Sequence, residues 1–181
     1  MVSDTHTLEA LRSDFDTCSK YSLSLPIAGF IVWFAIGALG TFLSLEQGVL
    51  ALIVLTGAIF PLALLIAKLR GEELLNNSNP FAKLMALAVL MVNLLWAIHI
   101  PLFISFPALV PVSIGVGLGL HWIVYSWIIQ NPLGTIHAVT RAVGLAFAWF
   151  FARNHIVTAS AVVVCVAYMW SIWMMNKRAK A

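Results

Sequence analysis

Residues 84–103 read LMALAVLMVNLLWAIHIPLF, a run of 20 residues without a charged side chain. A helix needs about 20 such residues to cross the hydrocarbon core of a bilayer. The run therefore predicts a membrane-spanning helix, and the rest of the chain has a similar character. Of the 181 residues, 62% are hydrophobic and 9% are charged, and the mean hydropathy is +0.99. Soluble domains are about one-quarter charged, so this composition excludes a soluble single domain and a disordered chain.

The other apolar runs, measured against the same length, predict an all-α polytopic transmembrane bundle of six helices. The predicted spans cover residues 26–45, 49–67, 84–103, 108–129, 135–151 and 155–175. A polar loop at 68–83 separates the second span from the third, and turns rich in proline, asparagine or glycine separate later ones. Pro61 and Pro111 predict kinks or late helix starts inside the second and fourth spans.

We expect three parts along the chain: a cytoplasmic segment 1–22, a six-helix transmembrane domain 23–176 and a basic cytoplasmic tail 177–181. Within the first part, residues 4–20 carry apolar side chains at helical spacing, with Asp4 as an N-cap. They predict either a short amphipathic helix on the membrane surface or an irregular tail.

Basic residues mark the two sides of the predicted bundle. One side has only Arg153, and the other has Arg12, Lys20, Lys68, Arg70, Lys83, Lys177, Arg178 and Lys180. The positive-inside rule then places both termini in the cytoplasm of a multi-pass cell-membrane protein, which requires an even number of spans. The same rule explains the net charge of +3. We therefore expect the lipid bilayer as a partner and no nucleic acid.

No aspartate or glutamate follows Glu73. This excludes proton relays and cation sites built on intramembrane carboxylates, and also the carboxylate pairs of glycosidases and di-iron bundles. No cluster of histidine, cysteine and carboxylate residues has the spacing of metal ligands, so we expect no metal site. No spacing favours His99 and His121 as axial haem ligands. The sequence thus requires no cofactor, and haem is disfavoured.

Five polar residues near the junction of the fourth and fifth spans are the candidate ligand-binding residues: His121, Tyr125, Asn131, His137 and Arg141. His121 and Tyr125 share one helix face, and so do His137 and Arg141, because each pair is four residues apart. One interpretation places all five around a polar pocket that opens to the cytoplasm. The alternative is five interfacial residues without a common site.

Arg141 has two interpretations of its own. It lies in the first turns of the fifth span, where its side chain can extend to the cytoplasmic headgroups. The alternative is contact with an anion or a phosphate headgroup, because no carboxylate is near it in the sequence.

Two further polar residues lie in the third span, and we expect structural roles for both. Asn93 is near the middle, where an amide commonly bonds to a neighbouring helix. His99 lies toward the outer end and is expected to be a satisfied interfacial histidine. In the fourth span, Gly115 and Gly119 form a small-residue face suited to close helix packing.

Several motifs resemble a family of small bacterial multi-pass membrane proteins, known as a domain of unknown function. They are the segment 79–84 (NPFAKL), Asn93, the segment 119–122 (GLHW) and the segment 125–127 (YSW). The resemblance covers roughly residues 68–135, with weaker similarity at the first two predicted spans. Its most specific part is the run from His121 to Trp127. Leu94 departs from it, since a polar residue is expected after the asparagine. The resemblance implies the architecture, implies a bacterial inner membrane and marks His121 and Tyr125, but it implies no reaction.

Three functions stay open at this point. The first is binding or transport of a small anionic or amphipathic molecule by a homo-oligomer, since six spans are few for a carrier. The second is a membrane enzyme acting on a lipid-like or isoprenoid substrate, with a histidine as general acid or base. The third is a structural or accessory subunit of a membrane complex, which needs no pocket. We place binding or transport first.

Overall fold

The computed structural model describes residues 7–20, 22–72 and 78–180. Within these ranges the elements are α1 (Leu8–Lys20), α2 (Ser24–Gly40), α3 (Leu45–Gly57), α4 (Ile59–Arg70), α5 (Pro80–Leu94), α6 (Trp96–Ser105), η1 (Pro107–Leu109), α7 (Val110–Ile129), α8 (Leu133–Phe151), η2 (Arg153–His155) and α9 (Ile156–Lys180). Every element in these ranges is helical, which confirms the all-α class.

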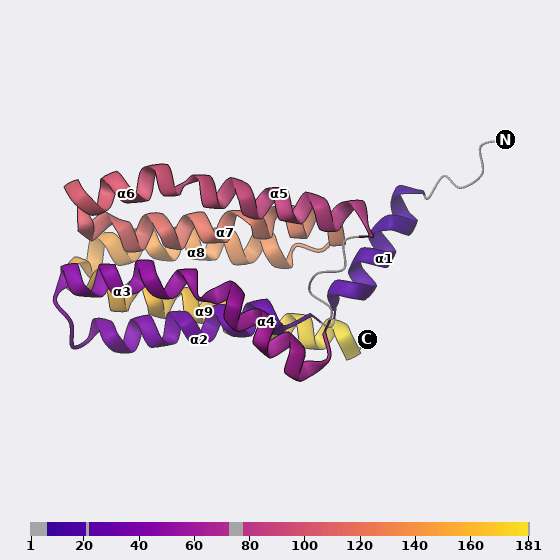
Figure 1. Cartoon of the computed structure of the whole chain (residues 1–181), viewed down its shortest axis with the longest axis horizontal. Coiled ribbons are helices and arrows are strands. Elements are labelled where there is room, and N and C mark those ends of the chain that lie inside the picture. Colours follow the sequence, from indigo (N-terminus) through magenta and orange to yellow (C-terminus); the bar gives the residue numbers. More distant parts are fainter. Residues whose placement is uncertain (1–6, 21, 73–77, 181) are drawn as a thin grey trace.

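The helices run back and forth along one long axis (Figure 1). α2 packs chiefly against α9, α9 against α8 and α8 against α7, while α5 packs on the outer side of α7. Among the described residues, four helical segments are long and apolar enough to cross a membrane: Pro80–Ser105, Pro107–Ile129, Leu133–Phe151 and Arg153–Lys180. The bent pair α3–α4 would be a fifth if its two helices form one span, and α2 is a shorter apolar helix of 17 residues.

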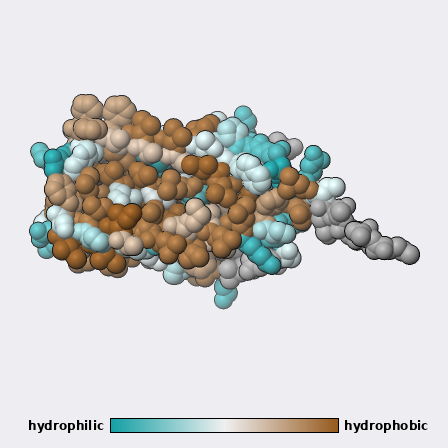
Figure 2. All heavy atoms as spheres, turned by 90° about the horizontal axis from the view of Figure 1, so that it is seen from above, coloured by the Kyte–Doolittle hydropathy of each residue, from teal (hydrophilic) through white to brown (hydrophobic). Residues whose placement is uncertain are grey.

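The surface of the molecule is also largely apolar along the length of these helices. Figure 2 shows a broad apolar region along the middle of the molecule, with hydrophilic side chains gathered toward its two ends. Large apolar side chains on its outside include Phe34, Leu94, Phe147 and Phe150. Exposed apolar surface of this extent would be unfavourable in water, and it is compatible with a membrane protein.

The predicted boundaries of the first two spans were wrong by four or five residues. The first helix ends at Gly40 instead of residue 45, because the Thr41 N–H turns back to the carbonyls of Ala38 and Leu39. The next helix begins at Leu45 instead of residue 49. Ser44 and Gln47 form a capping box there, with each side chain bonded to the other residue's backbone N–H.

Other boundaries also moved because of side-chain caps. α5 begins at Pro80 instead of residue 84, since Asn79 Oδ1 accepts a hydrogen bond from the Phe81 N–H. α8 begins at Leu133 instead of residue 135, since Asn131 Oδ1 accepts one from the Leu133 N–H. The last helix continues to Lys180, past the predicted end at residue 175, and its last turn is basic as the helix dipole favours.

The two central breaks in the bundle lie in the pairs α3–α4 and α5–α6. α3 and α4 are bent by 43° at Ala58. Pro61 contributes to this bend because it has no N–H for the carbonyl of Gly57, as the predicted kink requires. Pro111 instead lies in the first turn of α7, where a missing N–H costs nothing, which is the predicted helix start.

The predicted N-terminal helix exists as α1, but it begins at Leu8. Thr7 Oγ1 accepts a hydrogen bond from the Ala10 N–H, which is an N-cap contact, whereas the predicted cap Asp4 lies outside the described residues. α1 crosses the end of the bundle at which α9 ends (Figure 1). Arg178 holds it there by donating to both carboxylate oxygens of Asp16, at 2.8 and 2.7 Å.

Glu72 joins the end of α4 to the start of α2. Its carboxylate accepts hydrogen bonds from the backbone N–H groups of Leu23 and Ser24, from the Ser24 hydroxyl and from Arg70. Burial by itself raises the pKa of Glu72, but the hydrogen bonds from Ser24, Arg70 and Leu23 together lower the pKa below its usual value. The ionised carboxylate is therefore the form that stabilises this junction.

Glu72→Gln is expected to lower the unfolding temperature at pH 7, and the difference from wild type should shrink as the pH falls. The sign follows from the lowered pKa: the stabilisation is complete above the pKa of the unfolded chain and is lost as the pH falls through the folded-state pKa. Unfolding curves of both proteins between pH 7 and pH 3 measure this difference. Glu46→Gln, which changes an exposed carboxylate at the other end of the bundle, is the control. A Glu72→Gln difference that stays constant over this range would contradict the prediction.

Candidate functional site

The site is built around one face of α8. His137 and Arg141 lie one turn apart on this helix, and both have 0% exposed surface. Arg141 is the ninth residue of α8, about 12 Å from its start at 1.5 Å per residue. Of the two interpretations of Arg141, the one in which its guanidinium extends outward to the headgroups does not fit this complete burial. The earlier helix start puts Arg141 deeper in the bundle, and its side chain turns inward.

Three other helices enclose the guanidinium of Arg141. Its central carbon lies 5.6 Å from the ring centroid of Trp33 on α2 and 5.4 Å from that of Tyr168 on α9. Both distances are typical of cation–π contacts. On α7, Gly119 provides room: a Cβ placed there would be 3.6 Å from the Cδ and Nε of Arg141. The arginine is thus held between aromatic faces and a glycine.

His137 is fixed by hydrogen bonds that define its tautomer. Its Nδ1 lies 3.2 Å from the Ala167 carbonyl oxygen and 2.8 Å from the Ser171 hydroxyl. A carbonyl only accepts, so this arrangement assigns the proton to Nδ1. Nε2 is then free to accept a hydrogen bond from Arg141 Nη1, at 3.4 Å. Trp122 stacks on the imidazole with ring centroids 4.1 Å apart, which fixes its plane.

Several buried donors around Arg141 have no acceptor among the described residues. The Nε and Nη2 groups of Arg141 have no hydrogen-bond partner of good geometry among the described residues, although the Tyr168 hydroxyl lies beside the guanidinium. The indole N–H groups of Trp33 and Trp122 also have no partner there. Buried polar groups are normally hydrogen-bonded, because each unpaired one costs about 1–3 kcal/mol. These four groups lack an acceptor, and the Nδ1 atom of His121 is also buried without a hydrogen-bond partner.

Nearby carboxylates do not fill this role. In the described part of the chain, Asp14 accepts from Asn79, Asp16 pairs with Arg178, and Glu72 binds Ser24 and Arg70. No described residue after Glu72 is acidic. Nor do any three described histidine, cysteine or acidic side chains form a group that could hold a metal ion.

The five candidate residues do not form one open pocket. His137 and Arg141 are in contact, and His121 is near enough to interact electrostatically with Arg141. Tyr125 lies one turn further along α7 and packs against Trp122 and Phe15.

Asn131 lies in the turn before α8. There its side chain caps the helix, and its carbonyl accepts from the Ser126 hydroxyl. Because His137 and Arg141 are completely buried, the cluster is enclosed, and the expected opening to the cytoplasm is not at these residues.

The sequence did not identify four residues around Arg141 and His137: Trp33, Trp122, Tyr168 and Ser171. Three of them lie on α2 and α9, and only tertiary packing brings them to the side chains of α8. The one available signal was the position of Trp122 beside His121, in the motif that carried the resemblance. We use the name Arg141 cluster for Arg141, His137, Trp33, Trp122 and Tyr168.

A sequence profile described as "Family of unknown function (DUF7010)" matches residues 8–178. The chain belongs to the DUF7010 family. This confirms the predicted resemblance to a domain of unknown function. The match extends from α1 to the last turn of α9, well beyond the predicted coverage of 68–135, so the Arg141 cluster lies within the DUF7010 match. No curated protein and no solved structure matches the chain.

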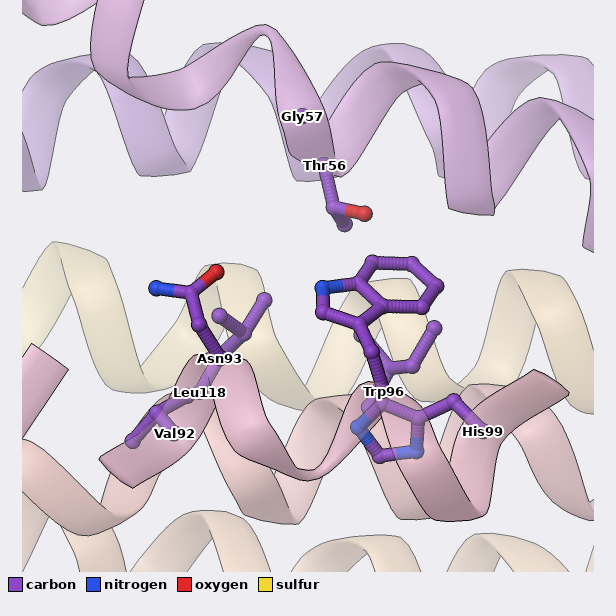
Figure 3. Close-up of a pocket in the computed structure, with 8 residues that line it drawn as sticks. Thr56, Gly57, Val92, Asn93, Trp96, His99 and Leu118 are labelled. Atoms are coloured by element: carbon purple, nitrogen blue, oxygen red, sulfur yellow. The ribbon is translucent and has the colours of Figure 1, made fainter. Parts of the chain in front are cut away.

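The DUF7010 chain also has a shallow pocket where its two broken helix pairs face each other. It has a volume of about 370 Å³ including its open side, and its lining includes Thr56, Gly57, Asn93, Trp96 and His99. Figure 3 shows Asn93 and Trp96 projecting across it toward α3. Both helix breaks therefore border one space in the middle of the molecule.

Asn93 and His99 differ in their hydrogen-bond partners. The expected bond from Asn93 to another helix was wrong: its amide donates to the Val89 carbonyl of its own helix at 2.9 Å. The pocket separates it from α3, so the amide turns back. His99 is buried, and its Nδ1 lies 3.0 Å from the Ser113 hydroxyl, so this histidine has a hydrogen-bond partner on α7.

Proposed function

We propose that this DUF7010 protein is an integral membrane protein that binds a small anion at the Arg141 cluster. The observation that carries the proposal is the complete burial of Arg141, with two unpaired donors and no carboxylate in contact among the described residues. An intramembrane charge costs about 2.5–3.5 kcal/mol on insertion scales and normally marks a functional site. A bound anion neutralises that charge and accepts from Nε and Nη2.

The membrane arrangement that we propose has six crossings with both termini in the cytoplasm. α2 becomes the sixth crossing, since its 17 residues reach the lower limit of about 17 for a transmembrane helix. Basic side chains support the orientation: the last turns of α4 and α9 contain Lys68, Arg70, Lys177, Arg178 and Lys180. Arg153 is the basic residue at the opposite end. Transport of the anion would be a further step, and we propose a homodimer for it.

Arg141→Met tests the proposal, because methionine keeps much of the side-chain length and removes the charge. We expect the unfolding temperature of the wild type in phosphatidylcholine nanodiscs to rise when gluconate is replaced by at least one of three anions: chloride, phosphate or acetate. A ligand at 100 times its Kd stabilises by about 2.7 kcal/mol. The variant should show no such rise. In gluconate it should be at least as stable as wild type, since an unpaired buried charge has been removed.

Arg153→Met is the matched control. This arginine is exposed and lies over Trp149, outside the Arg141 cluster, so its replacement should leave the response to anions intact. A wild type that none of the three anions stabilises would contradict the proposal. An equal response in wild type and Arg141→Met would also contradict it, because the anion would then act elsewhere.

A further inference from the structure

We infer that the Arg141 cluster selects a small monovalent inorganic anion, such as chloride, bromide or nitrate, over sulfate and hydrogen phosphate. The inference rests on the proposed function and specifies the ligand of the same site. Three features of the cluster support it: its charge, its donor groups and its enclosure.

The net charge of the Arg141 cluster is a single positive charge. Arg141 is permanently cationic, whereas the hydrogen bonds of His137 describe a neutral imidazole that accepts from Arg141 through Nε2. Protonation of that nitrogen would replace the 3.4 Å hydrogen bond by two facing positive groups. A monovalent anion leaves the enclosed site neutral. A dianion leaves one uncompensated negative charge in a region of low dielectric constant.

The donors favour an anion that gives up water easily. Apart from the guanidinium, the unpaired donors are the indole N–H groups of Trp33 and Trp122, and much of the surrounding surface is aromatic. These groups replace only part of a hydration shell. Strongly hydrated sulfate and phosphate therefore lose more solvation than they regain here, whereas bromide, nitrate and chloride lose less.

The enclosure limits the size of the ligand. Arg141, His137 and Trp33 each have 0% exposed surface. Gly119 lies beside Nε, where an added methyl group would be 3.6 Å away, at ordinary van der Waals distance. Unlike Gly115, which lies tightly against Leu145, Gly119 has space toward Arg141. A group the size of a methyl therefore fits beside Nε, which is an unpaired donor.

A phosphodiester headgroup is also monovalent, so the source of the anion has to be tested. We would measure anion binding by wild-type protein in phosphatidylcholine nanodiscs, using the unfolding temperature and the line width of ³⁵Cl in NMR spectra. Bromide, chloride, nitrate, sulfate and hydrogen phosphate would be titrated with gluconate keeping the ionic strength constant. A second set of nanodiscs would contain phosphatidylglycerol.

We expect apparent Kd values for the three monovalent anions at least tenfold below those for sulfate and hydrogen phosphate. Nitrate should displace chloride and narrow the chloride line, and Arg141→Met should abolish the broadening. Gly119→Ala should weaken chloride binding at least tenfold while its unfolding temperature in gluconate stays near that of wild type. Gly57→Ala, with nothing within 4 Å of the added Cβ, should bind as wild type does.

Each contrary result has a distinct meaning. Binding of dianions with equal or higher affinity, still dependent on Arg141, would overturn the selectivity and leave the proposed function intact. Arg141-dependent chloride binding could be present in phosphatidylcholine nanodiscs and lost in those that contain phosphatidylglycerol. That result would show that a lipid phosphodiester is the ligand, and it would overturn the inference of an inorganic anion. If no anion binds in an Arg141-dependent manner, both the inference and the proposed function fail. The wild-type titrations decide the class of anion even if Gly119→Ala does not fold.

Discussion

Trp33→Ala is expected to lower the free energy of unfolding by about 3 kcal/mol or more, the lower part of the range for buried tryptophan. Trp33 is completely buried on α2, and its ring faces the guanidinium of Arg141. Lipid tails are as apolar as the bundle interior, so transfer to lipid contributes little. The cost comes from the cavity and the lost packing. The same variant should bind anions more weakly, because one wall of the Arg141 cluster is gone.

Reversible unfolding in mixed micelles measures this difference, and Trp173→Ala is its matched control. Trp173 is on α9, with 59% of its surface exposed, and its replacement leaves no enclosed cavity. Its effect should stay below about 0.5 kcal/mol, as for other surface substitutions. Equal losses in the two variants would mean that Trp33 is not in the packed interior.

Gly134→Ala should have the second largest effect, a loss of about 1–3 kcal/mol from overpacking. A Cβ at this position would meet the backbone carbonyl of Trp122, with the carbonyl carbon 2.9 Å away and the oxygen nearer still. Backbone atoms cannot rotate aside as a side chain can. α7 and α8 would have to separate, which would also move Trp122 away from His137.

Gly57→Ala is the contrasting variant, because its effect on stability is expected to have the opposite sign. Its added Cβ has nothing within 4 Å, and alanine is favoured over glycine inside helices by up to about 1 kcal/mol. This variant should therefore be as stable as wild type or slightly more stable, in the same unfolding experiment. Destabilisation of the same size in both variants would mean that the α7–α8 contact is not what controls the effect of Gly134→Ala.

Local chemistry explains which parts of the fold the sequence predicted. Long apolar runs gave the approximate positions of the helices, Pro61 gave the bend, and four-residue spacing gave the shared face of His137 and Arg141. The capping box at Ser44 and Gln47 was also visible as a pattern but was missed, which shifted two boundaries. Asn131 was assigned to a pocket, whereas its position before α8 already favoured a capping role.

Which helices pack against each other could not be predicted from these local patterns. In water, the polar and apolar sides of a helix show which side faces the core. α2 is apolar on nearly all of its sides, so nothing in the spacing indicated that it would pack against α9. Trp33 and Tyr168 therefore joined Arg141 only in the folded structure. The depth of Arg141 was misjudged for a simpler reason, the uncertain start of its helix.

The pairing of α2 with α9 sets an order for assembly. Two hydrogen bonds join these helices across long stretches of sequence: Thr158 donates to the Gly37 carbonyl, and the Cys165 thiol to that of Phe30. During synthesis, α2 is made long before its partner exists. Until α9 is made, the face of α2 that carries Trp33 lacks the helix against which it packs in the folded structure. The Arg141 cluster, which needs both helices, is therefore completed only when the last long helix joins the bundle.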